Sequence, residues 1–346
     1  MTAKAASARY RRVIGRFKQA RIAVVGDLIA DEFLYGQIER VSREAPVLIV
    51  RYDATEVVPG GAGNAANNAA ALGASVDVIG VVGRDEAGRR LLDSLGRGAS
   101  ARNVLVANRH VTPVKTRILA GGVHSAKQQV VRIDRAGTVV TPAIQRHVEA
   151  ALARALRRAD AVIISDYGYG AITPGVWRRA LASARVKTRP LVLVDARHGL
   201  TGYAGAMTAT TPNESEVEAL LGVHIDEDRN VLERAGRTLL ERLRCPAVLV
   251  TRGSRGMALF ETGAPTDHIP IVGSDQVSDV TGAGDTVIAT FALALTAGAS
   301  FSEAARLANY AGGIVVMKRG TATVSAAELA DAIRNDAGSS FTQNVK

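Results

Sequence analysis

The residues best suited to chemistry lie near the end of the chain, where two acids flank a short run of glycine and alanine. The segment Asp279-Val280-Thr281-Gly282-Ala283-Gly284-Asp285 opens an apolar stretch that extends to Ala297. Small residues at a helix start leave backbone N–H groups unpaired and pointing to one spot, which favours an anion. Asp285 would at least complement the helix dipole. It is also suited to act as a general base while the amides stabilise a phosphoryl group, so the segment favours phosphoryl transfer.

A second glycine-rich run lies nearer the start of the chain. It reads Gly60-Gly61-Ala62-Gly63-Asn64-Ala65-Ala66 and leads into an alanine-rich helical stretch. Residues 61–66 imitate a dinucleotide fingerprint, but the preceding Val57-Val58-Pro59 is a poor buried strand and no acid follows at the required spacing. Glycines that open a helix equally let the backbone approach a polar ligand closely, or simply form a tight turn.

Weaker signals come from two polar groups in the second half of the chain. Asn213 and Glu216 start a helix after Thr211-Pro212, and residues 251–256 follow a strand. Taken alone, Asn213 is an ordinary N-cap and Glu216 the acid of a capping box. Beside an anion site, they would supply contacts to magnesium and phosphate. Because no glycine precedes a lysine, the chain has no Walker A loop, and a nucleotide-using enzyme of this sequence belongs to another class.

Alternating strands and helices must position these residues. Five apolar runs are typical of buried strands: 22–25, 76–82, 161–164, 191–194 and 247–250. Helical spacing appears between them, as in the stripe of Ile144, Val148, Leu152 and Leu156. The alternation predicts an α/β fold with a mostly parallel sheet covered on both faces. Ligands of such folds bind at the carboxyl ends of the strands, where the sequence has Asp27, Asp166, Asp195 and Thr251.

Two segments interrupt the alternation. Residues 34–58 and 112–135 are predicted to be extended and to form a small β lid, with a turn at Gly121-Gly122. Neither a linker nor a repeat is visible, so we expect one domain over residues 1–346. The basic N-terminal segment lacks an apolar signal core. Its residues 13, 14 and 17 have helical spacing, which predicts an amphipathic helix leading into the fold.

Composition excludes several classes of protein. Hydrophobic residues make up 47% and charged residues 22% of the chain, as in globular rather than disordered proteins. No apolar run approaches the roughly 20 residues of a membrane span. A single cysteine allows no internal disulfide, so we expect a cytoplasmic protein. The basic residues are scattered and aromatic residues are few, which argues against nucleic acid, and the net charge of +10 suits an anionic small substrate.

Taken together and in this order, the motifs resemble those of the ribokinase-like (PfkB) carbohydrate kinases. G-G-A-G-N-A-A-N, N-x-x-E and D-V-T-G-A-G-D extend the likeness over about residues 20–335. Further stretches resemble the bacterial D-glycero-β-D-manno-heptose-7-phosphate kinases: residues 25–36, 42–47, 115–119, 128–134, 165–168 and 318–325. Many of those relatives carry a C-terminal nucleotidyltransferase with an H-x-G-H motif, which is absent from this sequence, so we expect a stand-alone kinase.

The resemblance implies a three-layer α/β/α sandwich with a small β lid, and ATP, Mg²⁺ and, in some relatives, K⁺ as cofactors. Asp285 would be the catalytic base, and the anion hole would be formed by Gly282, Ala283 and Gly284. The residues expected near ATP are Asn213, Glu216, Thr251, Gly253, Gly256 and Asn309, with Glu216 acting on Mg²⁺ through water. Asp279 and Thr281 match positions that bind a monovalent cation in some relatives.

The same resemblance implies a sugar-phosphate site beneath the lid. The residues expected at the sugar are Asp27, Gly60, Gly61, Asn64 and Asp166. A phosphate calls for converging cations, and the candidates are Lys115, Arg117, Lys127 and Arg132. Three features depart from the heptose kinase pattern. Tyr169 replaces the lysine of D-Y-G-K-G, Asp195-Ala196-Arg197 replaces D-P-K, and residues 121–125 are an insertion.

We therefore expect ATP-dependent phosphorylation of D-glycero-β-D-manno-heptose 7-phosphate at O1, giving the 1,7-bisphosphate for ADP-heptose and lipopolysaccharide synthesis. One alternative is another sugar kinase of the family, acting on fructose 1-phosphate, ribose or a nucleoside. Alternatives from other classes are a dinucleotide-dependent oxidoreductase, based on residues 61–66, and a non-catalytic binding module. The expected partners are the sugar phosphate, ATP and a second copy of the chain joined through the lid, with neither nucleic acid nor membrane.

Overall fold

A central sheet organises the computed structural model, which describes residues 3–122, 127–138, 140–186, 188–272, 279–318 and 320–342. Within these ranges the sheet has nine strands in the order β13-β12-β11-β10-β9-β8-β1-β4-β5. They are β1 (Arg21–Gly26), β4 (Ser75–Gly83), β5 (Ala99–Ala107), β8 (Ala161–Asp166), β9 (Leu191–Ala196), β10 (Ala209–Thr210), β11 (Ala247–Thr251), β12 (Met257–Glu261) and β13 (Asp267–Ile269). All neighbours pair in parallel except β11–β12 and β12–β13. The predicted mostly parallel sheet is confirmed.

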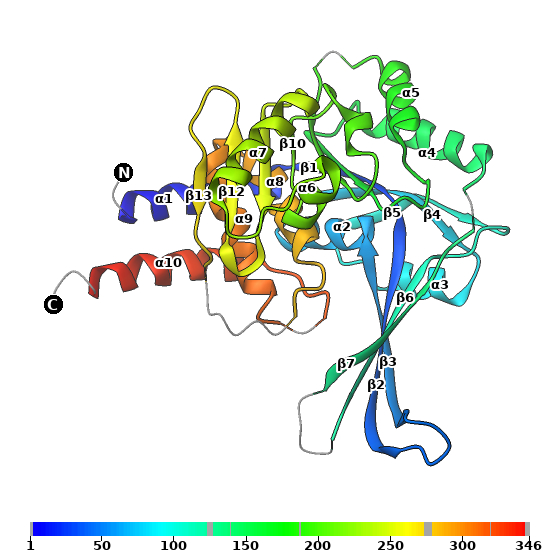
Figure 1. Ribbon diagram of the computed structural model, residues 1–346. Coiled ribbons are helices and arrows are strands. Elements are labelled where there is room, and N and C mark those ends of the chain that lie inside the picture. The colour runs from blue at the N-terminus through cyan, green and yellow to red at the C-terminus, as the bar shows by residue number, and fades with distance from the viewer. Residues whose placement is uncertain are drawn as a thin grey trace.

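Helices cover both faces of this sheet (Figure 1). One layer contains α1 (Ala3–Ile14), α2 (Ala62–Ala71), α3 (Glu86–Asp93), α8 (Ala283–Thr296), α9 (Phe301–Val315) and α10 (Ala326–Thr342). The other contains α4 (Pro142–Ala155), α5 (Pro174–Ala184), α6 (Glu214–Leu221) and α7 (Arg229–Leu243). Side chains alternate between the two cores along each strand: in β1, residues 22 and 24 belong to the first and residues 23 and 25 to the second. The predicted α/β/α sandwich is confirmed.

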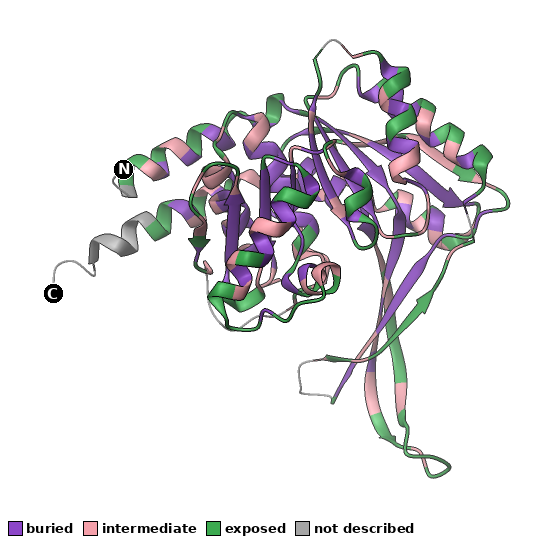
Figure 2. Ribbon diagram, turned by 45° about the horizontal axis from the view of Figure 1, so that its top comes forward, coloured by how far each residue is buried: buried purple, intermediate pink, exposed green. Residues whose placement is uncertain are grey.

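A separate four-stranded sheet, the lid, projects from the sandwich (Figures 1 and 2). Its order is β3-β2-β6-β7, with β2 (Leu28–Val41), β3 (Leu48–Gly61), β6 (Val114–Gly121) and β7 (Gln128–Arg135). The first pair extends beyond the predicted 34–58 at both ends because β2 begins in the core and becomes exposed only toward its tip. The predicted insertion at 121–125 continues from the end of β6 into residues outside those described.

The position of Gly60 and Gly61 in the lid excludes the dinucleotide-binding alternative. Residues 60 and 61 end β3, which pairs antiparallel with β2 and belongs to the lid rather than to the parallel sheet. A dinucleotide fingerprint requires a parallel strand that leads directly into the helix. The oxidoreductase hypothesis was therefore wrong.

Several local predictions are confirmed. Ile144, Val148, Leu152 and Leu156 are all buried on one side of α4 and its end. The N-terminal helix α1 lies beside α10 (Figure 1). The capping box predicted for α10 is present, since Ser325 N–H donates to Glu328 Oε2 at 2.8 Å and Glu328 N–H donates to Ser325 Oγ at 3.2 Å. No helix in the described part of the chain is long and apolar enough to cross a membrane.

Candidate active site

In the described part of the chain, the start of α8 presents three backbone N–H groups without a partner. Gly282, at φ 78°, turns the chain into the helix, and the N–H of Ala283 donates to the carbonyl of Val280 at 3.2 Å. Among the described residues, the N–H groups of Gly282, Gly284 and Asp285 have no acceptor. The partial positive charge of the helix end strengthens these donors. Of the three residues expected to form the anion hole, Gly282 and Gly284 thus have a free N–H group, whereas that of Ala283 is occupied.

Asp285 is buried, and its two oxygens have different neighbours. Asn64 donates an N–H from Nδ2 to Oδ2 at 2.7 Å, and the Tyr167 hydroxyl donates to Oδ1 at 3.4 Å. Burial raises the pKa of Asp285 to about 7, against the opposing effect of the bond from Asn64. A carboxyl group with a pKa near neutrality is suited to take up a proton and to return it.

A cavity of about 210 Å³ opens in front of Asp285 and includes residues of the lid. Asp31, Lys115 and Arg117 line it from β2 and β6. The Arg117 guanidinium lies 2.6 Å from Asp31 Oδ1, and both side chains are nearly buried. Arg117 is thereby neutralised, whereas Lys115 has no carboxylate within ion-pair distance in the described part of the chain.

Tyr167 brings a further cation close to Lys115. The Nζ of Lys115 lies 4.9 Å from the centre of the Tyr167 ring, and the Cζ of Arg197 lies 4.7 Å from it. Burial, and then the charge of Arg197, lower the pKa of Lys115. Both cations line the cavity next to Asp285. The positive charges of Lys115 and Arg197 therefore favour the binding of an anionic substrate group in this cavity.

The remaining two lid cations lie away from this cavity. Lys127 pairs with Asp53 at 2.6 Å, and Arg132 pairs with Asp134 at 2.6 Å. Neither lines the cavity next to Asp285. The structure thus brings two of the four cations expected from the sequence to that carboxyl group.

The glycines expected at the sugar lie at the base of the lid. Gly61, at φ 55°, lines the cavity. Gly60 lies against Asp31: a Cβ at this position would be 2.3 Å from Asp31 Oδ2. A larger residue at position 60 would displace the Asp31 carboxylate and disturb its ion pair with Arg117.

The two acids expected at the sugar, Asp27 and Asp166, lie outside that cavity. The Asp27 carboxylate accepts the backbone N–H groups of residues 167, 169 and 171 at 2.9 to 3.0 Å. Burial raises the pKa of Asp27 to about 6. Asp166 accepts a bond from the Tyr203 hydroxyl at 2.8 Å. Asp27 therefore orders the loop that carries Tyr167, and its contact with sugar stays a prediction.

Asn213 and Glu216 form a complete capping box at the start of α6. Glu216 N–H donates to Asn213 Oδ1 at 2.8 Å, and Asn213 N–H donates to Glu216 Oε2 at 2.9 Å. Both residues line the cavity with Asp285 and Asp195. Burial, and then the charges of Asp285 and Glu216, raise the pKa of Asp195 to about 8. The side-chain oxygens of Asn213, Glu216 and Asp195 are of the type that a hard cation such as Mg²⁺ prefers.

A second, mainly apolar cavity of about 160 Å³ adjoins the first. It contains four of the six residues that the resemblance places near ATP: Thr251, Gly253, Gly256 and Asn309. Gly256, at φ 77°, cannot be replaced freely, since a Cβ would lie 2.1 Å from the Ile269 carbonyl oxygen. Thr251, Val280 and Gly284 line both cavities. The two cavities are therefore neighbours, and the apolar one lies next to the one that contains Asp285.

The expected monovalent-cation residues lie beside this region. Asp279 accepts the N–H of Thr281 at 2.9 Å and the N–H of Gly320 at 3.1 Å. Both carboxylate oxygens thus already hold backbone groups. Residues 273–278, which precede Asp279, are outside the described ranges. The described part of the chain has no cluster of three or more His, Cys, Asp or Glu residues suited to a metal.

Sequence reasoning missed three residues of this site: Asp31, Tyr167 and Arg197. Tyr167 and Arg197 follow directly after β8 and β9. Because ligands bind at the carboxyl ends of the strands in such folds, these two residues could have been selected for the same reason as Asp166 and Asp195. Asp31 is an acid within the apolar run that starts β2. A charge in such a run is expensive unless it is paired, and this signal could have revealed it.

Known proteins resemble this chain over most of its length. The model of the pfkB family carbohydrate kinases matches residues 19–328. The bifunctional protein HldE of Pelobacter propionicus is 41% identical over 323 residues, which is 93% of this chain and 64% of that protein. HldE of Geobacter sulfurreducens is 42% identical over 308 residues, which is 88% of this chain and 61% of that protein. The chain thus spans less than two thirds of the length of these relatives.

Solved structures share the fold. Arabidopsis thaliana ribokinase, complexed with ribose and ATP, has a TM-score of 0.71 at 22% identity and covers 91% of this chain and 99% of its own. Escherichia coli phosphofructokinase-2, in complex with fructose-6-phosphate, has a TM-score of 0.72 at 19% identity with the same coverage. At these identities, the likeness supports the fold alone.

Proposed function

The chain belongs to the pfkB family of carbohydrate kinases, and from this premise we propose that it phosphorylates D-glycero-β-D-manno-heptose 7-phosphate at O1 with ATP. The product would be the 1,7-bisphosphate, a precursor of ADP-heptose and lipopolysaccharide. The observation that carries the proposal is the pair of cations, Lys115 and Arg197, beside the Tyr167 ring in the cavity of Asp285. A phosphorylated acceptor needs cations in the acceptor cavity to bind its phosphate group, whereas a neutral sugar does not.

In the proposed mechanism, Asp285 removes the proton from O1 as this oxygen attacks the terminal phosphorus of ATP, and the bond from that phosphorus to the bridging oxygen breaks, so that ADP leaves. The N–H groups of Gly284 and Asp285 donate to the oxygens of the transferred phosphoryl group, where negative charge develops. Lys115 and Arg197 orient the acceptor through its phosphate, and the lid above them excludes water. Asn64 keeps the Asp285 carboxylate aimed at the cavity by its bond to Oδ2.

ATP and Mg²⁺ fit the residues present. The apolar cavity that contains Gly256 and Asn309 suits a nucleobase. Asn213, Glu216 and Asp195 line the adjoining cavity of Asp285 and would supply oxygen ligands to Mg²⁺. When bound, Mg²⁺ would neutralise charge on the ATP phosphates. A K⁺ requirement, based on Asp279 and Thr281, remains part of the proposal.

A panel of acceptors tests the substrate. ADP release with ATP and Mg²⁺ is measured for the heptose 7-phosphate, fructose 6-phosphate, fructose 1-phosphate and ribose. We expect strong turnover of the heptose phosphate alone. Turnover of another sugar, with none of the heptose phosphate, would contradict the proposed substrate while leaving the role of Asp285 intact.

Two matched variants test the assigned cations. Lys115→Ala removes the unpaired cation, and Lys127→Ala removes a lid cation that is paired with Asp53 outside the cavity. We expect kcat/KM for the heptose phosphate to fall about 10–100-fold in the first, since a bond to a charged group contributes about 1.5–3 kcal/mol. The second should stay near wild type. Equal effects would contradict the assignment.

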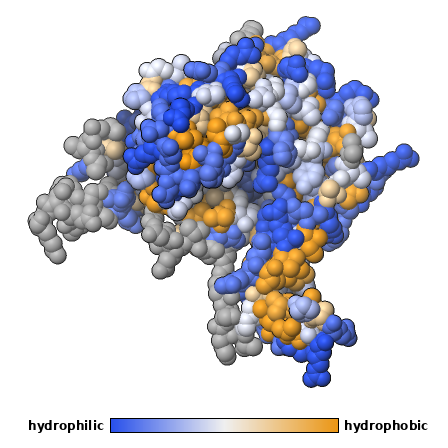
Figure 3. All heavy atoms as spheres, viewed as in Figure 1, coloured by the Kyte–Doolittle hydropathy of each residue, from blue (hydrophilic) through white to orange (hydrophobic). Residues whose placement is uncertain are grey.

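We also propose that two copies of the chain pair through the outer face of the lid. In β6 and β7 the register places Lys115, Arg117, Arg132 and Asp134 on one face. Ile118, Val131 and Ile133 share the opposite face, and the latter two are 48% and 47% exposed. Figure 3 shows apolar side chains gathered on the lid. Exposed apolar patches of this kind mark interfaces in soluble proteins.

A further inference from the structure

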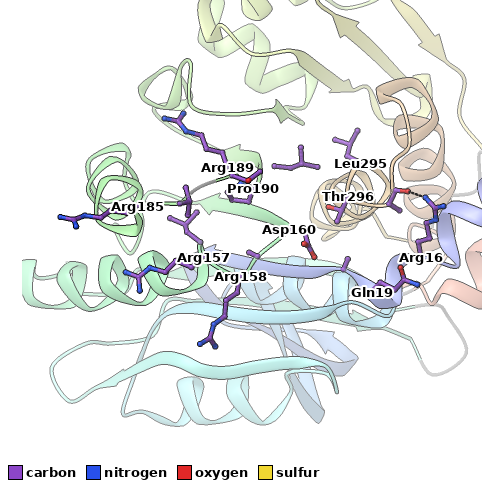
Figure 4. Close-up of a pocket in the computed structure, with 17 residues that line it drawn as sticks. Arg16, Gln19, Arg157, Arg158, Asp160, Arg185, Arg189, Pro190, Leu295 and Thr296 are labelled. Carbon is purple, nitrogen blue, oxygen red and sulfur yellow. Dashed lines mark hydrogen bonds between the residues drawn. The ribbon is translucent and has the colours of Figure 1, made fainter.

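Two groups of arginine side chains lie outside the active-site cavity, and they differ in whether the side chains converge. The first surrounds a hollow of about 1120 Å³ between the segments that lead into β1, β8 and β9. Figure 4 shows Arg158, Arg185 and Arg189 of this hollow pointing away from one another, so they form no common site. The second group lies in the turn 251–256, where two arginines share one carboxylate.

That carboxylate belongs to Glu214, the first residue of α6. Its Oε1 accepts the N–H of Arg252 Nε at 3.0 Å, and its Oε2 accepts an N–H of Arg255 Nη2. The side chains of Glu214 and Arg252 are only 11% and 9% exposed. A carboxylate buried this far is costly unless charged donors compensate it. Both oxygens of Glu214 are thus committed to one turn of the chain.

The turn held by Glu214 forms part of the apolar cavity. The N–H of Arg252 donates to the carbonyl of Gly256 at 2.9 Å, and the N–H of Gly256 donates to the carbonyl of Gly253 at 3.1 Å. Four residues of the turn line the cavity: Thr251, Gly253, Ser254 and Gly256. Neither arginine side chain lines it. The ion pairs therefore act on the cavity through the backbone of the turn.

A second acid supports the turn from the loop between α6 and α7. Arg255 Nη1 lies 3.6 Å from Asp226 Oδ1, and Arg252 Nη2 donates to the carbonyl of Asp226 at 3.4 Å. The Asp226 side chain is 71% exposed, so solvent screens this pair and makes it weak. Glu214 is therefore the main anchor of the turn.

Glu214 is also fixed to the opposite half of the proposed ATP site. It directly follows Asn213, whose capping box with Glu216 sets the start of α6, and both of these residues line the active-site cavity. The backbone joins the same two segments, since the N–H of Thr251 donates to the carbonyl of Pro212 at 3.0 Å. One carboxylate thus ties the residues that would hold Mg²⁺ to the turn that lines the apolar cavity.

We propose that Glu214 is a positioning residue for ATP, which sets the spacing between the nucleobase half and the phosphate half of the nucleotide site. The inference rests on the ATP site of the proposed function. Glu214 lines neither cavity, so it acts without touching the nucleotide. Because ATP must engage both halves at once, a change in their spacing weakens ATP more than a ligand that occupies one half.

Calorimetric titration with ATP–Mg²⁺ and with adenosine tests this role in Glu214→Gln, which keeps the shape of the side chain and removes its charge. We expect ATP affinity to fall about 10–100-fold, as for the loss of a bond between charged groups, and adenosine affinity to stay near wild type. Charge attraction alone predicts the opposite sign, since the variant makes the site more positive and would bind ATP more tightly.

A matched control removes a comparable ion pair away from both cavities. Glu149 on α4 is 20% exposed and pairs with Arg179 at 2.7 Å, and it lines neither cavity. Glu149→Gln should bind ATP and adenosine as wild type does. Thermal unfolding checks that each variant is folded. Should Glu214→Gln fail to fold, Glu214→Asp keeps the charge but shortens the side chain by one methylene, so it cannot keep both bonds, and ATP affinity should again fall more than adenosine affinity.

Three results would overturn the inference. ATP binding that is unchanged or tighter in the Glu214 variant excludes positioning by this residue. Equal losses for ATP and adenosine would reveal local damage to the apolar cavity, and equal losses in Glu214→Gln and Glu149→Gln would reveal a general effect of instability. The titrations contain no acceptor, so failure of the heptose phosphate as a substrate would leave their outcome unaffected.

Discussion

The hydrogen bond from Asn64 to Asp285 should control the pH at which the enzyme becomes active. Asp285 accepts a proton only when it is ionised, so activity should rise with pH through its pKa of about 7. Asn64 donates to the ionised carboxylate at 2.7 Å and thereby lowers this pKa. Asn64→Ala removes the donor and leaves the carboxylate buried. The pKa should therefore increase, and the acid limb of the pH profile should move toward alkaline pH.

The size of the shift follows from the strength of the lost bond. A hydrogen bond to a charged group contributes about 1.5–3 kcal/mol, and one pKa unit corresponds to about 1.4 kcal/mol, so the limb should move by about 1–2 units. The assay is kcat/KM against pH, which reports on the free enzyme. At pH 6 the variant should lose about 10-fold or more relative to wild type, while at pH 9 the two should approach each other.

The neighbouring asparagine provides a matched control. Asn67 lies on the same helix, α2, but accepts from Gly96 N–H at 2.8 Å and has no bond to Asp285. Asn67→Ala should leave the acid limb in place. An unmoved limb in Asn64→Ala, or equal movement in both variants, would refute the assignment of this limb to Asp285.

Three further predictions address catalysis, assembly and packing. Asp285→Asn should lower kcat by about 10²–10⁴ without a matching loss of ATP binding, measured by ADP release and calorimetry; near-normal turnover would exclude a general base at this position. Val131→Asp/Ile133→Asp should give a monomer by light scattering where wild type is a dimer, and an unchanged mass would exclude this face as the interface. Gly236→Ala should cost about 1–3 kcal/mol in urea unfolding, because its Cβ would lie 2.2 Å from the Phe260 ring; an unchanged midpoint would contradict this tight packing.

The class of fold and the family were readable from the sequence because both depend on local patterns. Runs such as 161–164 and 191–194 are apolar throughout, as strands covered on both faces must be, and helical stripes separate them. The run of small residues before Asp285 determines a helix start with free amides by backbone chemistry alone. The family match over residues 19–328 and the sandwich confirm these predictions.

Tertiary structure decided which of the candidate residues meet. The register of β2 against β6 sets Asp31 opposite Lys115, and the packing of the lid on the sandwich brings both to Asp285, while Lys127 is left outside. The sequence could not reveal this, because a register shift of one residue sends every side chain to the other face.

A contact between distant segments could not be predicted either. The donation from Asn64 to Asp285 joins residues 221 positions apart. Sequence spacing determines the neighbours along one helix or strand. Contacts between distant segments form only once the sheet has set the strand order, and they determine the electrostatics of the active site.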